Sequence, residues 1–85
     1  MTGFKIWFPD KKKKEKVVMC RGNCDADFFG FMQYAIDSMY HPEILILENE
    51  ENGVTYDAYR LATEHYGMRK RTFDERMAGI TTYKK

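Results

Sequence analysis

The sequence has few of the residues that define several protein classes. Its 85 residues include two cysteines, two prolines and a single serine, Ser38. Two cysteines are too few for a disulfide-stapled secreted domain, where about four to eight are usual. No apolar run approaches the roughly 18 residues of a membrane-spanning helix, and none has the form of a signal peptide. We therefore expect a cytoplasmic protein that makes no membrane contact.

Catalytic signatures are equally scarce. Ser38 lacks a Gly-x-Ser-x-Gly context, and the six glycines are scattered, so no phosphate-binding loop is formed. Asp25 and Asp27 are explained by the start of a helix, where carboxylates favour the dipole. His65 lies on the apolar face of a predicted helix, a position typical of a core histidine. We expect no enzyme activity and no cofactor.

The two cysteines, Cys20 and Cys24, have three residues between them. Redox pairs have two intervening residues, and a zinc site would need His41 and His65 as further ligands although these have no zinc-finger spacing. Cysteine is also among the residue types most often buried. A role in packing is therefore favoured, and a metal or thiol site is the minor alternative.

The residues that are abundant indicate a folded single domain, residues 1–85. Hydrophobic residues make up 44%, with six Phe, six Tyr and one Trp, far too many for a disordered chain. The net charge of +1 conceals three blocks: residues 1–24 are basic, residues 25–64 contain Arg60 as their one base among many acids, and residues 65–85 are basic again. If the blocks stay apart in the fold, the surface carries separate fields that steer partners.

The first half of the chain predicts a hairpin and a helix. Residues 4–8 and 17–20 are short apolar runs, with the lysine-rich residues 11–16 as their loop, and the first run is expected at a sheet edge. Helical spacing then places Phe28, Met32, Ala35 and Met39 on one face of a helix over residues 26–40, with Asp25 as its N-cap and Gln33 and Asp37 on the opposite face.

The second half predicts a buried central strand at residues 43–48 and a turn at residues 49–53. A helix is favoured at residues 56–66, although the alternation over residues 54–58 also fits a strand. Thr72 and Glu75 have the spacing of a capping box for a short helix ending at Ala78, and residues 80–83 are predicted as a closing edge strand. The fold class is therefore α+β: a small mixed or antiparallel sheet with helices on one face, in the order β-β-α-β-α-(α)-(β).

Aromatic side chains exceed what one core needs, and such residues are enriched in protein interfaces. We therefore predict a non-catalytic binding protein that docks onto a larger protein with a basic surface; a homodimer is a further option. By analogy of class, small regulators of viruses and mobile elements work in this way, for instance as inhibitors of nucleic-acid-processing machines, with carboxylates imitating phosphates. The predicted docking residues are Trp7, Phe31, Tyr34 and Tyr59 with the acidic Glu48, Glu50, Glu51 and Asp57.

The alternative is an accessory nucleic-acid-binding protein whose lysines and arginines contact phosphates. Its isoelectric point of about 7.7 is below the value near 9 that is typical of nucleic-acid-binding domains, so this function is less favoured. The residues concerned are Lys11, Lys12, Lys13, Lys14 and Lys16 in the first loop and Arg69, Lys70 and Arg71 near the C-terminus.

Overall fold

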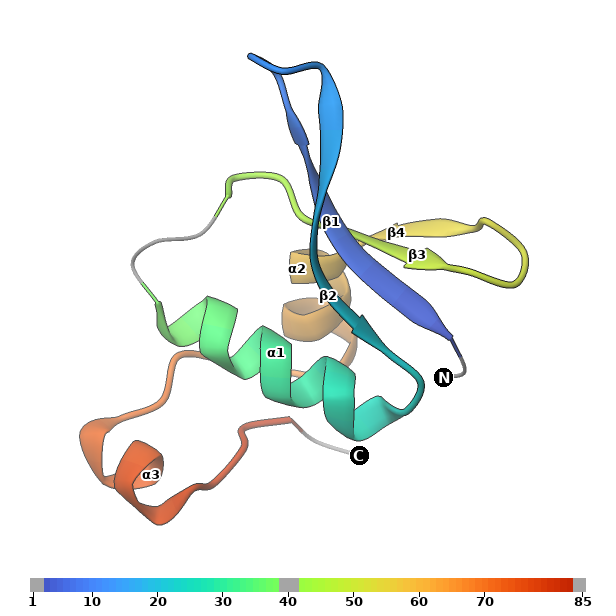
Figure 1. The fold of residues 1–85 in the computed structure, drawn as a ribbon. Helices are drawn as coiled ribbons and strands as arrows, with labels where there is room; N and C mark the ends of the chain where they lie inside the picture. The colour runs from blue at the N-terminus through green and yellow to red at the C-terminus, as the bar shows by residue number, and fades with distance from the viewer. Residues whose placement is uncertain (1–2, 39–41, 84–85) are drawn as a thin grey trace.

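The computed structural model describes residues 3–38 and 42–83 and has an α+β fold built on a four-stranded antiparallel sheet (Figure 1). The strands have the order β2-β1-β3-β4. Their bounds are Phe4–Asp10 for β1, Glu15–Gly22 for β2, Ile46–Asn49 for β3 and Thr55–Asp57 for β4. The helices are α1 (Asp25–Asp37), α2 (Ala58–Arg60), the π-helix η1 (Leu61–His65) and α3 (Phe73–Ala78). The predicted fold class is confirmed.

The first hairpin forms as predicted, but its turn is shorter than residues 11–16. Lys11 to Lys14 make the turn, and the Asp10 carboxylate accepts hydrogen bonds from the backbone N–H groups of Lys12 (3.0 Å) and Lys13 (3.2 Å). Lys16 belongs to β2. The expectation that residues 4–8 lie at a sheet edge is wrong, because β1 pairs with β2 on one side and with β3 on the other. The edges are β2 and β4.

Helix α1 begins at the predicted place, with Cys24 and not Asp25 at the N-cap position. Asp25 and Asp27 lie in its first turn, where the unpaired N–H groups favour negative charge. The helix ends at Asp37, earlier than the predicted end at residue 40, and Ser38 is already extended. The predicted core position of Met39 falls on residues 39–41, which lie outside the described part of the chain.

The segment after α1 differs from the prediction in two respects. The central strand begins at Ile46 and not at residue 43, although Leu45 is buried and its carbonyl accepts a hydrogen bond from the Ala58 N–H at 2.9 Å. The predicted helix over residues 56–66 starts only at Ala58, with Asp57 as its N-cap, because Thr55 and Tyr56 pair with β3 as strand β4. The strand and the helix that the sequence suggested for this segment are therefore both present, the strand at Thr55–Asp57 and the helix from Ala58.

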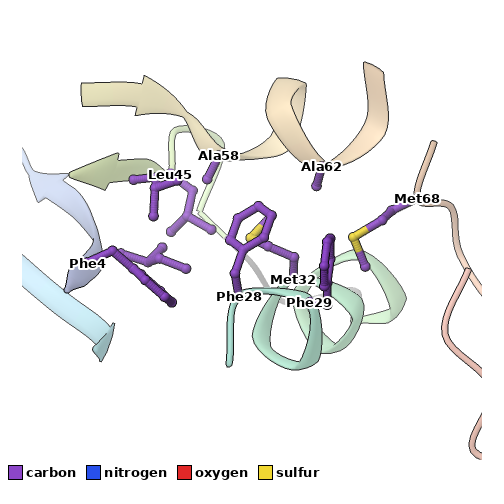
Figure 2. Close-up of a cluster of buried hydrophobic side chains, with 10 residues drawn as sticks. Phe4, Phe28, Phe29, Met32, Leu45, Ala58, Ala62 and Met68 are labelled. Carbon is purple, nitrogen blue, oxygen red and sulfur yellow. The ribbon is translucent and has the colours of Figure 1, made fainter. Parts of the chain in front are cut away.

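The core lies between the sheet and the helices α1, α2 and η1, which share one face of the sheet (Figure 2). Its members come from all of these elements and from the segments beside them: Phe4, Ile6, Phe28, Phe29, Met32, Leu45, Leu47, Ala58, Ala62 and Met68. Phe4 and Phe28 meet edge to face, with ring centroids 6.3 Å apart, the geometry that the ring quadrupoles favour. Ala58 and Ala62 are fully buried, and such small side chains let their helix approach the core closely.

The C-terminal segment folds over α1 and contradicts two predictions about this region. Residues 80–83 form no strand; the Thr82 N–H instead donates to the side-chain oxygen of Gln33 at 3.0 Å, and Tyr83 stacks on Phe29 with ring centroids 3.9 Å apart. Gln33 and Asp37, predicted on the exposed face of the helix, are consequently covered. The Asp37 carboxylate accepts from the Arg71 guanidinium at 2.7 Å and from its backbone N–H at 2.9 Å.

Helix α3 has the predicted capping box. The Thr72 hydroxyl accepts from the Glu75 N–H, the Glu75 carboxylate accepts from the Thr72 N–H, and Gly79 ends the helix in the left-handed region with φ of 69°. Both features are sequence signals with a physical cause, since they satisfy backbone groups that a helix end leaves without partners. The helix lies beyond α1, away from the sheet (Figure 1).

Two glycines give opposite predictions for stability. A Cβ at Gly22 would lie 2.6 Å from the Phe4 ring and 2.7 Å from the Asp27 Cβ, so we expect Gly22→Ala to lower the free energy of unfolding by about 1–3 kcal/mol through overpacking. Gly30 lies within α1 with open space around it, so Gly30→Ala should raise it by about 0.5–1 kcal/mol. Urea unfolding of both variants is the measurement, and equal effects of the two substitutions would contradict this packing of β2 on α1.

Candidate functional site

Three of the four predicted docking aromatics line one surface depression, which we call the aromatic groove. Phe31 and Tyr34 come from α1 and Tyr59 from α2, and the remaining walls are Met19, Ala35, Pro42 and Leu45. The groove is shallow, with a volume of ≈ 20 Å³. Tyr34 is 69% exposed and Met19 46% exposed, whereas Phe31 and Tyr59 are partly buried against the core. Burial raises the pKa of the Tyr59 hydroxyl.

Trp7, the fourth predicted aromatic, lies elsewhere. It is 9% exposed and alternates with the core residue Ile6 along β1, so it faces the opposite side of the sheet. Its indole N–H donates to the Glu48 carboxylate at 3.2 Å, and the Lys16 ammonium lies 4.5 Å from the ring centroid. Trp7 is therefore covered and does not belong to the aromatic groove.

Glu48 is also occupied, which is at variance with its predicted role as a phosphate mimic. Its carboxylate lies 3.3 Å from the Lys5 ammonium and 3.5 Å from that of Lys16. Burial opposes ionisation of this group, but the two lysines and the Trp7 hydrogen bond outweigh it, so the pKa of Glu48 is lowered. A carboxylate neutralised by two ammonium groups contributes little field to a partner.

The other predicted acids lie around the β3–β4 hairpin. Glu50 and Glu51 are exposed in its turn, and Asp57 is exposed at the end of β4, where its carboxylate accepts from the Arg60 N–H at 3.2 Å. Figure 1 places this turn at the far end of the hairpin from α1. The predicted acidic and aromatic residues therefore form two surfaces instead of one.

The predicted basic residues are also divided. Lys11, Lys12, Lys13 and Lys14 are exposed at the end of the β1–β2 hairpin, which we call the lysine tip, whereas residues 69–71 lie near α3 at the opposite end of the molecule (Figure 1). Arg69 is paired with Glu75 at 2.7 Å and Arg71 with Asp37 at 2.7 Å. The two predicted basic segments therefore lie apart and do not form one continuous surface.

The cysteines form no metal site with other described residues. Cys20 and Cys24 are free thiols, and no three His, Cys, Asp or Glu side chains within residues 3–38 and 42–83 come together to hold a metal ion. His41, one of the ligands weighed for zinc, lies outside those ranges. Burial, and then the charge of Asp27, raises the pKa of the Cys20 thiol, which disfavours the reactive thiolate.

Two surfaces were missed by reasoning from the sequence. The first is a hollow of ≈ 240 Å³, which we call the edge hollow, lined by Phe4, Leu47, Asn49, Tyr56, Leu61, His65 and Tyr66. His65 was predicted as a core residue but is exposed at its wall. The second is the surface of α3, where Phe73 and Met77 are 75% and 73% exposed; their spacing of four residues was a helix signal in the sequence.

The described surfaces contain apolar depressions, a lysine tip and an acidic hairpin. Comparison with known proteins adds no assignment: no family model matches the chain, and no curated protein or solved structure shows significant similarity to it. No helix among the described residues is long and apolar enough to cross a membrane.

The ion pair between Arg69 and Glu75 has a measurable consequence for the pKa of Glu75. The Arg69 guanidinium, and then the Thr72 N–H, lower the pKa of Glu75 from 4.5 to about 2. Because the folded-state pKa is lowered, these contacts stabilise α3 fully above pH 4.5 and are lost as the pH falls toward 2. We expect the Glu75 carboxyl carbon to titrate near pH 2 by NMR, and Arg69→Met to move its pKa back toward 4.5.

Arg76→Met is the matched control for that titration, because it removes an arginine from the same helix without touching the Arg69–Glu75 pair. It should leave the titration midpoint close to that of the unchanged protein. A Glu75 midpoint near 4.5 in the unchanged protein would show that Arg69 is not held by the carboxylate and is available to a ligand.

Proposed function

We propose that this chain is a non-catalytic binding protein that docks onto a larger protein through the aromatic groove. The observation that carries the proposal is the convergence of Phe31, Tyr34 and Tyr59, from two helices, on one exposed apolar surface. Tyrosine and phenylalanine supply large contact areas at low entropic cost and are enriched at the centres of interfaces. A depression of ≈ 20 Å³ is too shallow for a ligand pocket and fits a matching protein face.

The charge beside the groove indicates the chemistry of the partner. Asp27 precedes Phe31 by one turn of α1, and Glu43 follows Pro42; both carboxylates are exposed. No described base lines the groove. A partner that presents an apolar side chain between basic residues is complementary to this surface. The proposal includes inhibition of the larger protein as one outcome of docking, by analogy of class with small viral regulators.

Removing the exposed ring of Tyr34 tests this function. We expect Tyr34→Ser to weaken partner binding by about 30-fold or more, since truncating a central interface aromatic costs about 2 kcal/mol or more. The measurement is affinity capture from the native host with nuclease treatment, followed by titration of the captured protein in purified form.

Phe73→Ser is the matched control, because Phe73 is equally exposed but lies on α3. It should bind as the unchanged protein does. Binding that is lost with Phe73→Ser and kept with Tyr34→Ser would place the docking surface on α3 and contradict the proposal, and capture that depends on nucleic acid would contradict direct docking.

A second candidate function is supported by the lysine tip. Four consecutive exposed lysines are held by the Asp10 turn at the end of a projecting hairpin (Figure 1). Such a tip can contact phosphates while the acidic β3–β4 hairpin stays away from the nucleic acid, so repulsion between the carboxylates and the phosphates is avoided. This supports an accessory contact with nucleic acid that does not read its sequence.

A salt-titrated mobility shift with a labelled single-stranded oligonucleotide tests the second function. Replacing the four tip lysines with Gln should abolish binding and its salt dependence, because each phosphate contact adds a slope of about −0.7 in single strands. Lys70→Gln combined with Arg76→Gln is the control and should leave binding unchanged. Absence of a shift at low salt with the unchanged protein would exclude this function.

A further inference from the structure

The edge hollow is bounded by a sheet edge on one side and an unusual helix on the other. Phe4, Leu47 and Leu61 make its apolar walls, and Tyr56, His65 and Tyr66 surround it with rings. A second hollow of ≈ 300 Å³ adjoins it and shares Tyr56, Leu61 and His65. Leu61 and His65 are the two ends of the π-helix η1, and π-helical turns are rare and recur at functional sites.

The size of the edge hollow suits one side chain. An apolar cavity of about 150 Å³ accepts a benzene ring, so ≈ 240 Å³ accommodates one aromatic or branched aliphatic group. The polar atoms at its rim, on Asn49 and His65, are few, as expected where apolar contact supplies most of the affinity.

Strand β4 next to the hollow is the last strand of the sheet, so no strand within residues 3–38 and 42–83 pairs with its outer side. The Asn49 N–H donates to the Val54 carbonyl and the Ala58 N–H to the Leu45 carbonyl, both at 2.9 Å. In an antiparallel pair the hydrogen-bonded positions alternate, so Thr55, which lies opposite Glu48, directs its N–H and C=O away from β3. These groups are available to an added strand.

The charges around β4 indicate a basic ligand. Glu50, Glu51, Asp57 and Glu64 are exposed near the edge, and the basic side chains lining the second hollow are Arg60 and His65. Glu64 is paired with Arg60 at 3.2 Å, which leaves the surroundings with an excess of negative charge. Lysine or arginine beside the inserted side chain would therefore be favoured.

From this juxtaposition we propose that the β4 edge binds an extended segment of another protein by strand addition. The segment pairs with the outward backbone groups of Thr55 and inserts one apolar side chain into the edge hollow, with basic residues flanking it. A residue opposite Tyr56 on the added strand projects toward the helix face, where both hollows open. Strand addition of this kind gives affinity through the backbone and specificity through the pocket. The site is separate from the aromatic groove and does not depend on it.

Synthetic acetylated peptides of the form Lys-Val-X-Val-Lys, with X as Ala, Leu, Phe or Trp, test the proposal by NMR titration. We expect at least one of the Leu, Phe and Trp peptides to shift the amide resonances of Thr55, Tyr56 and His65. The Ala peptide should bind at least about tenfold more weakly, since it buries far less apolar area. A peptide with Glu in place of both Lys residues should also bind more weakly.

Thr55→Pro and Thr55→Ala separate the backbone contact from the side chain. Proline is tolerated where an edge-strand N–H points outward, and it should lower the affinity by about tenfold or more because a hydrogen bond is lost. Thr55→Ala keeps the N–H and should bind nearly as the unchanged protein does. If Thr55→Pro fails to fold, N-methylation of the Val amide next to X, the peptide residue that lies opposite Thr55, removes the same type of contact from the ligand side.

Three results would overturn the proposal. They are absence of shifts at Thr55, Tyr56 and His65 with every peptide at millimolar concentration, equal binding by the two Thr55 variants, and binding of the Ala peptide as strong as that of the best of the Leu, Phe and Trp peptides. Tyr34→Ser should leave the peptide titration unchanged, and Thr55→Pro should leave docking through the aromatic groove unchanged. The two surfaces can therefore fail or succeed separately.

Discussion

The buried amide of Gln33 is the interaction on which the arrangement of the C-terminal half depends. Its nitrogen donates to the Arg69 carbonyl at 2.9 Å and to Asp37 at 3.1 Å, and its oxygen accepts from the Thr82 N–H at 3.0 Å. The side chain is 2% exposed, so an unmade bond here would cost about 1–3 kcal/mol. Because these partners lie on both sides of α3, one side chain of α1 fixes where the C-terminal segment lies and how α3 is presented.

Ion pairs between the basic and acidic blocks of the sequence reduce the charge that each block contributes to the surface. Glu48 of the acidic block pairs with Lys5 and Lys16 of the first basic block, and Asp37 pairs with Arg71 of the last. Glu50, Glu51 and Asp57 remain exposed around the β3–β4 hairpin, and Lys11 to Lys14 remain exposed at the lysine tip. Separate negative and positive surface regions therefore exist at two ends of the sheet. Each carries less net charge than its block of sequence, because part of that charge is neutralised by ion pairs.

The proposed binding surfaces follow from how the sheet is covered. Helices α1, α2 and η1 cover one face, and their junctions with the sheet leave the aromatic groove on one side and the edge hollow on the other. Both surfaces have apolar walls with exposed carboxylates in their neighbourhood, which is why both proposals name a basic partner. The shallow groove suits a protein face, whereas the edge hollow, with β4 beside it, suits one extended segment. If both proposals hold, the two surfaces lie far enough apart in the fold to be occupied separately.

Local signals in the sequence determined the first hairpin, the start of α1 and the capping box of Thr72 and Glu75, because each depends on neighbours within a few residues. Periodicity could not place Gln33 and Asp37, since the segment that covers them is about 35 to 50 residues away along the chain. The covering of Trp7 likewise depended on β1 lying between β2 and β3. That position brings Trp7 to Glu48, which is 41 residues away along the chain. Only the tertiary structure therefore decided which predicted docking residues share a surface, because that choice rests on long-range pairing of strands and burial of polar groups.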